Sequence, residues 1–175
     1  MDEENRNIKH IIKDNYDNNR DILESISHYD VILDWDLDDS SHFIFKEFDK
    51  QYPGSKFILN TKNVNSWLRS RKKHYLRKRK RIQNDPNYNQ DWPSINIEKW
   101  RKHYQRHHDA VYRYFKYRPN DLLVFDVSRG HGFKEICEFL DIPKTNKIFP
   151  LINYGNSFKK RFKSKSINFI NRFLR

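Results

Sequence analysis

The chain has 175 residues with a net charge of +12, and 15% of them are aromatic, which fits one folded domain with a hydrophobic core and argues against disorder. Residues 1–60 contain 7 basic and 14 acidic residues, a net charge of −7. Residues 61–175 contain 28 basic and 9 acidic residues, and their net charge of +19 favours an anionic partner. The single cysteine, Cys137, excludes a disulfide framework within one chain, and the polar start and lack of a long apolar run argue against a signal peptide or membrane span, so we expect a cytoplasmic protein.

The N-terminal third of the chain is predicted to contain two helices and one strand. Residues 5–27 have a rough apolar stripe that is typical of a polar surface helix. The apolar run 31–33, which ends at Asp34, indicates a buried strand. Ser41 is placed to cap a second helix, which ends at the turn residues 52–55.

The rest of the chain alternates strands with longer helices. The predicted elements, in order, are a strand at 56–60, a strongly basic helix at 64–82, a loop at 84–93, a helix at 95–117, a strand at 122–127, a helix at 133–140 and a basic, aromatic helix at 157–174. Three short apolar strands that alternate with helices indicate an α/β fold of three layers, in which a parallel sheet is buried on both faces. Such sheets bind ligands where strands end and helices begin, here at residues 34–39, 61–70 and 128–132.

Four segments occur in the order found in one enzyme family. They are YPGSK followed by FILNTKNVNSWLRS at 52–70, RPNDLLV at 118–124, EICEFLDIP at 135–143 and FPLIN at 149–153. In this order they resemble the P-loop sulfotransferases, and the resemblance covers residues 28–156. It implies a single sulfotransferase-like domain of the P-loop NTPase type over residues 1–175, with residues 157–175 as a C-terminal helix.

The resemblance also implies a nucleotide cofactor, 3′-phosphoadenosine 5′-phosphosulfate (PAPS). In the family, a basic residue after the strand and a serine eight positions later bind its 3′-phosphate, and Lys62 and Ser70 occupy those positions. Ser66 lies one turn before Ser70 on the same helix face. A helix N-terminus is a suitable site for a phosphate. The chain departs from the family pattern, because Lys62, Asn63 and Val64 stand where the family has Arg, Asp and Pro.

The reaction implied by the resemblance is sulfuryl transfer from PAPS to a hydroxyl or amine of a small-molecule or glycan acceptor. Asp34, at the end of the predicted strand, is the candidate general base, although an Asp at this place also commonly caps a turn. The family's glycine-rich phosphosulfate loop is absent, since the first glycine is Gly54. We therefore expect an N-terminally truncated domain, which binds nucleotide weakly and transfers no sulfate as an isolated chain.

Two basic segments of the chain also suit partners other than a nucleotide. Residues 69–81 contain nine Lys or Arg, so the alternative function is a non-catalytic nucleic-acid-binding or interaction protein, and the helix at 64–82 is a candidate site for an anionic partner. The C-terminal helix combines aromatic and basic residues, which suits an anionic membrane surface or a protein partner.

Three smaller patterns favour a structural interpretation. His103 and His107 have the spacing of a zinc pair, but basic neighbours crowd them, so we expect a surface helix that includes His108 and no metal site. Residues 128–132, SRGHG, could bind an anion, but two glycines in such a turn usually serve backbone geometry. Cys137 lies among apolar residues and is expected in the core.

Overall fold

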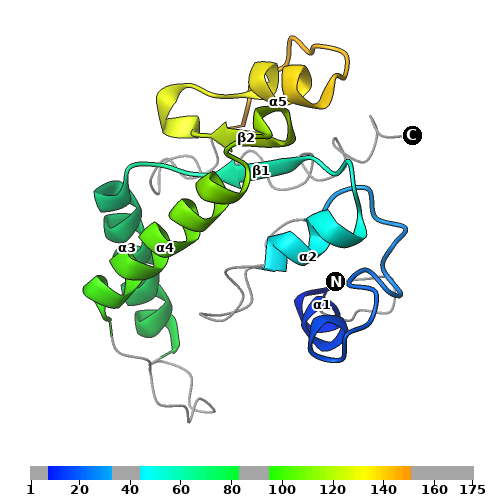
Figure 1. The fold of residues 1–175 in the computed structure, drawn as a ribbon. Coiled ribbons are helices and arrows are strands. Elements are labelled where there is room, and N and C mark those ends of the chain that lie inside the picture. The colour runs from blue at the N-terminus through cyan, green and yellow to red at the C-terminus, as the bar shows by residue number, and fades with distance from the viewer. Residues whose placement is uncertain (1–7, 33–43, 83–94, 151–175) are drawn as a thin grey trace.

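The computed structural model describes residues 8–32, 44–82 and 95–150 (Figure 1). Its elements are α1 (Ile8–Asp17), α2 (Ile44–Gln51), β1 (Phe57–Asn60), α3 (Val64–Ile82), α4 (Ile97–Tyr114), β2 (Leu122–Phe125) and α5 (Phe133–Leu140), with short 3-10 turns at Pro119–Asp121 and Val127–Arg129. The helices predicted at 64–82 and 133–140 are confirmed. The loop predicted at 84–93 and the helix predicted at 157–174 lie outside the described residues.

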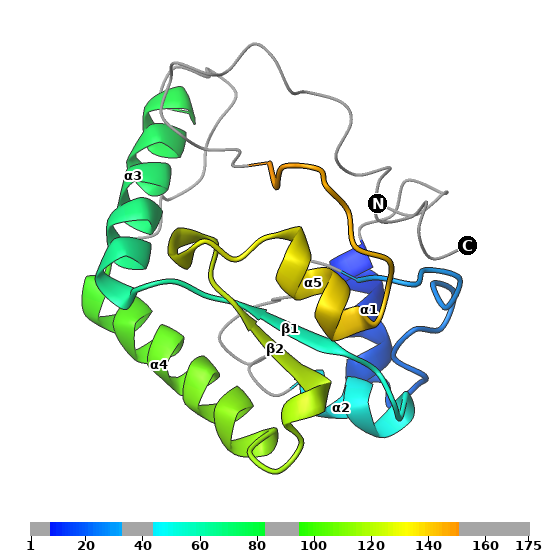
Figure 2. The ribbon, with the colours of Figure 1, turned by 90° about the horizontal axis from the view of Figure 1, so that it is seen from above.

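The two strands form a parallel pair. Phe57 pairs with Leu122 and Asn60 with Phe125, so the strands start and end together. The connection between them consists of α3 and α4, which pack against each other and return the chain to the amino end of the pair (Figure 2). Both strands therefore present their carboxyl ends at the same edge.

Helices α2 and α4 cover one face of β1. The cluster there contains Phe45, Leu59, Val111 and Phe115, none of which is more than 7% exposed. The ring of Phe45 lies 6.1 Å from that of Phe115. Because alternate residues of a strand point to opposite faces, Phe57 and Leu59 enter this cluster together.

Helix α5 lies on the opposite side of the strands from α2 and α4 (Figure 1). The rings of Phe125 and Phe133 lie 5.5 and 5.0 Å from that of Phe149, and Cys137 is buried, as predicted. Ile58, by contrast, is 43% exposed. The prediction that the strands are buried on both faces is therefore wrong at Ile58 of β1, in the part of the chain that the structure describes.

The prediction of one helix over residues 5–27 is also wrong. Helix α1 ends at Asp17, and Asn19 adopts a left-handed conformation with φ of 53°, which asparagine tolerates better than most residues. The buried amide of Asn15 donates to the carbonyls of Ile22 (3.4 Å) and Glu24 (3.1 Å), so the chain folds back on α1. These contacts satisfy the backbone of the irregular segment without a helix.

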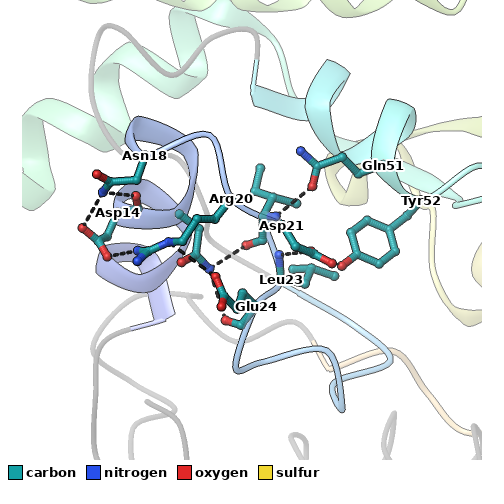
Figure 3. Close-up of polar contacts among 10 residues, drawn as sticks. Asp14, Asn18, Arg20, Asp21, Leu23, Glu24, Gln51 and Tyr52 are labelled. Atoms are coloured by element: carbon teal, nitrogen blue, oxygen red, sulfur yellow. Dashed lines mark hydrogen bonds and ion pairs between the residues drawn. The ribbon is translucent and has the colours of Figure 1, made fainter.

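Side chains on this segment connect it to α2 (Figure 3). The backbone N–H of Ile22 donates to Oε1 of Gln51 at 2.8 Å, and the Tyr52 hydroxyl donates to Asp21. Burial, together with the bond to Asp21, raises the pKa of Tyr52 to about 12. Arg20 pairs with Asp14 on α1. The N-terminal segment is thereby held against α2 by polar as well as apolar contacts.

The predicted strand at 31–33 is not confirmed. Val31 and Ile32 have no strand conformation, and Leu33 lies outside the described residues. Ile32 packs instead against the cluster of Ile12, Ile22, Ile26 and Ile44. Ile32 is therefore partly buried against this isoleucine cluster rather than in a strand. None of the helices in the described ranges is long and apolar enough to cross a membrane.

Candidate nucleotide site

The carboxyl ends of the two strands define the edge at which the candidate residues gather. The N–H of Thr61 donates to the carbonyl of Phe125 at 2.8 Å, which extends the strand pairing by one bond. Residues 61–63 then turn, and α3 begins at Val64. The turn predicted to hold Lys62 therefore lies directly beyond the parallel pair, where α/β folds bind ligands.

Asn63 caps α3. Its side-chain oxygen accepts from the N–H groups of Asn65 at 3.1 Å and Ser66 at 3.2 Å. The amide thus caps the first turn of α3 without a negative charge. Because two of the free N–H groups of the first turn are used, an anion here must be bound mainly by side chains.

The three predicted cofactor-binding residues lie near the start of α3. Lys62 is partly exposed in the turn, and Ser66 and Ser70 follow on one helix face, Ser66 partly exposed and Ser70 exposed. Arg69, which the sequence analysis did not select, donates from Nη2 to Oγ of Ser66 at 2.9 Å. Two hydroxyls, an ammonium group and a guanidinium group fit a phosphate monoester. The residues therefore fit the 3′-phosphate of PAPS.

A partly buried polar network supports the turn from α4. The Tyr104 hydroxyl donates to the carbonyl of Lys62 at 2.6 Å and lies 2.8 Å from the hydroxyl of Thr61. The Thr61 hydroxyl lies 2.9 Å from Nε2 of His108, whose Nδ1 lies 2.9 Å from the carbonyl of Tyr104. His108 is only 9% exposed, so the prediction of a surface helix is wrong at this residue. Burial lowers the pKa of His108 and favours its neutral form.

Aromatic and cationic side chains fix α3 against α4. The guanidinium of Arg71 lies 5.1 Å from the ring centre of Trp67 and 5.0 Å from that of Trp100. Arg101 donates to the side-chain oxygen of Asn65 at 3.1 Å. These contacts join the start of α3 to α4 and hold the candidate site in one geometry.

The loop at 128–132 serves backbone geometry, which confirms the structural interpretation. The buried carboxylate of Asp126 accepts from the N–H and hydroxyl of Ser128 at 2.9 and 2.5 Å. Gly130 has φ of 93°, a conformation that favours glycine. The N–H of Asp126 donates to Nδ1 of His131 at 3.1 Å. The polar groups of the loop therefore bind one another.

Two further predictions concern the candidate general base and the histidines of α4. Asp34, the candidate general base, lies outside the described residues. Within the described ranges, no three His, Cys, Asp or Glu side chains lie close enough together to hold a metal ion, and this includes His103 and His107.

A basic face extends from the candidate site along α3. We define it by the six residues that line a hollow of about 390 Å³: Arg69, Lys72, Lys73, Leu76, Arg77 and Lys80. Helix α3 contains no acidic residue, so no carboxylate within it can neutralise this face. A second hollow, on α4, contains Glu98, which pairs with Lys102 at 4.0 Å. The two basic surfaces therefore differ in net charge.

Strands, helices and turn together define a mixed helix and parallel-strand protein with a candidate anion site beyond the strand ends. The model of the sulfotransferase domain family matches residues 2–93 and 85–158. The chain therefore belongs to the sulfotransferase domain family, as the resemblance implied, and its parallel pair with flanking helices is compatible with the α/β fold of that family. No curated protein and no solved structure matches the chain.

Proposed function

We propose that the chain is a PAPS-binding sulfotransferase-like domain with the three-layer P-loop fold. The family reaction is transfer of a sulfuryl group to a hydroxyl or amine of a small-molecule or glycan acceptor. We expect the isolated chain to transfer no sulfate, because no glycine-rich loop precedes Gly54. Lys62, Ser66 and Ser70 bind the 3′-phosphate, and Asp34 is the candidate general base. PAPS supplies the sulfuryl group when bound.

The observation that supports the proposal is the position of the three residues in the turn after β1 and the first two turns of α3, beyond paired strand ends, in a chain of this family. Lysine binds phosphate as a point charge without the two-pronged geometry of arginine. Arg69, bonded to Ser66, supplies a guanidinium at the same site. The proposed site therefore combines both kinds of cation.

We expect adenosine 3′,5′-bisphosphate, which has the 3′-phosphate but no sulfuryl group, to raise the melting temperature of the protein. A ligand that binds only the native state stabilises it by mass action, by about 2.7 kcal/mol at a hundred times its Kd. Lys62→Ala and Ser70→Ala should each abolish the shift. Differential scanning fluorimetry across a ligand titration measures it.

A matched control uses a lysine of α4. Lys99→Ala removes the same charge from the second basic hollow and should leave the shift unchanged. The proposal fails if millimolar ligand produces no shift in the unmodified protein. It also fails if Lys99→Ala and Lys62→Ala reduce the shift equally, because binding would then reflect net charge alone.

The basic face of α3 is the observation that supports the alternative function, binding of nucleic acid. The family match favours the sulfotransferase-like function, so we treat nucleic acid as an additional partner to be tested. Contact between lysine or arginine and a phosphate backbone releases counterions, which makes affinity fall steeply with salt.

If nucleic acid binds here, replacing Arg77, Lys78, Arg79 and Lys80 with glutamine should weaken binding to all sequences and flatten its salt dependence. Lys62→Ala should have little effect on the same binding. Fluorescence anisotropy with labelled duplex and single-stranded DNA, at 50 and 200 mM salt, measures both quantities. Lack of binding to either strand form at 50 mM salt eliminates this partner.

A further inference from the structure

The turn that contains Lys62 is held from the side by a helix more than forty residues later in the chain. Tyr104 and His108 are one turn apart on α4, and their rings stack with centres 3.8 Å apart. The Tyr104 ring also lies 5.1 Å from that of Trp67 on α3. Tyr104 is therefore packed between the first turn of α3 and the next turn of its own helix.

The protons of this network can be assigned from the acceptors. A carbonyl only accepts, so Nδ1 of His108 carries a proton toward the Tyr104 carbonyl, and Nε2 of the neutral ring accepts from Thr61. The Tyr104 hydroxyl donates its only proton to the Lys62 carbonyl at 2.6 Å, so this assignment leaves no proton for its 2.8 Å contact with Thr61 Oγ1. Each hydroxyl proton has an acceptor.

We propose that Tyr104 and His108 are positioning residues of the nucleotide site, which act through Thr61 and the Lys62 carbonyl to fix the phosphate-binding turn. This inference rests on the proposed function of Lys62. Neither residue has a role in the family resemblance, and neither needs to touch the nucleotide. They fix the backbone from which Lys62 projects, so that less conformational entropy is lost when the phosphate binds.

The test compares two tyrosines of α4 that each donate one hydrogen bond of 2.6 Å, Tyr104 to the Lys62 carbonyl and Tyr114 to Asp49. Tyr104→Phe keeps the stacked ring and should weaken binding of adenosine 3′,5′-bisphosphate by about five- to tenfold, the effect of one lost hydrogen bond. Tyr114→Phe should lower thermal stability but leave the Kd unchanged. Isothermal titration calorimetry measures the Kd of each variant.

Thr61 supplies a second, independent pair of variants. Thr61→Val removes the hydroxyl but keeps the shape, whereas Thr61→Ser keeps the hydroxyl, so only Thr61→Val should weaken binding. Amide hydrogen exchange of residues 61–66 in the absence of ligand should be faster in Tyr104→Phe and Thr61→Val, but not in Tyr114→Phe. This readout does not depend on the nucleotide.

The outcomes separate this inference from the proposed function. If the unmodified protein binds no nucleotide, the proposed function and the positioning role both fail. If it binds and Tyr104→Phe binds equally well, the positioning role alone is wrong. It is equally wrong if Tyr114→Phe weakens binding as much as Tyr104→Phe, because general loss of stability would then explain both.

Discussion

Replacement of Phe45 by alanine is expected to lower the free energy of unfolding by about 3–5 kcal/mol, the usual effect of removing a large buried side chain. Phe45 is 2% exposed, and its ring lies 5.3 Å from that of Tyr114 and 6.1 Å from that of Phe115. It joins α2 to α4 over one face of β1, so its removal leaves a cavity in the cluster of Phe45, Leu59, Val111 and Phe115. Urea unfolding followed by tryptophan fluorescence measures the loss.

A strand residue provides the control. Ile58→Ala also shortens an apolar side chain next to the core, but Ile58 is 43% exposed and its loss should be below about 1 kcal/mol. If Phe45→Ala and Ile58→Ala destabilise the protein equally, the cluster around Phe45 does not form the core in solution.

The second large effect is expected at Asp49, whose carboxylate joins α2 to the end of α4. It accepts from Nη1 and Nη2 of Arg118 at 3.0 and 2.7 Å and from the Tyr114 hydroxyl at 2.6 Å, and its side chain is 10% exposed. Asp49→Asn removes the charge and leaves donors without acceptors. We expect a loss of about 2–3 kcal/mol at pH 7, because hydrogen bonds to charged groups are the stronger ones.

The effect should depend on pH in a defined direction. The hydrogen bonds from Arg118 hold the pKa of Asp49 below its usual value. Its stabilising contribution is therefore complete above the unfolded pKa of about 3.9 and is lost as the pH falls through the lower folded pKa. The difference in unfolding free energy between the unmodified protein and Asp49→Asn should be constant from pH 7 to pH 5 and shrink below pH 4.

An exposed ion pair gives the matched control for this charge. Lys13 and Asp17 lie 2.8 Å apart on α1, with side chains 46% and 51% exposed. Asp17→Asn should change stability by less than about 0.5 kcal/mol at any pH, because solvent screens exposed pairs. An equal effect of Asp17→Asn and Asp49→Asn would contradict the importance that we assign to the bond with Arg118.

Sequence patterns correctly predicted the helices that are set by local signals, such as a capping residue at the start of the helix. The helix Val64–Ile82 begins at the capping residue Asn63, and α5 begins just after Gly132, whose N–H donates to the Glu135 carboxylate at 2.6 Å. Two predictions near the N-terminus were wrong because the deciding contacts are tertiary. Asn15 holds the chain that folds back after α1, and Ile32 packs against the isoleucine cluster without strand conformation.

The candidate site was predicted only in part. Lys62, Ser66 and Ser70 were selected through the family resemblance and remain a prediction, whereas Tyr104 and His108 were missed, because their partners lie more than forty residues away. A signal was present in the sequence. Residues at positions 100, 104, 108, 111 and 115 have the spacing of one helix face, and all are aromatic, histidine or valine. That pattern indicates a helix whose polar rings face inward.

The parallel pairing of β1 with β2 also constrains the order in which the molecule can fold. Phe57 and Leu122 pair although α3 and α4 lie between them in the sequence. This contact therefore spans far more residues than those within the N-terminal isoleucine cluster. Contacts between distant residues form late, because the intervening chain must first be closed into a loop. During synthesis, the N-terminal isoleucine cluster can therefore form before Phe115 and β2 are available to cover Phe45 and Leu59.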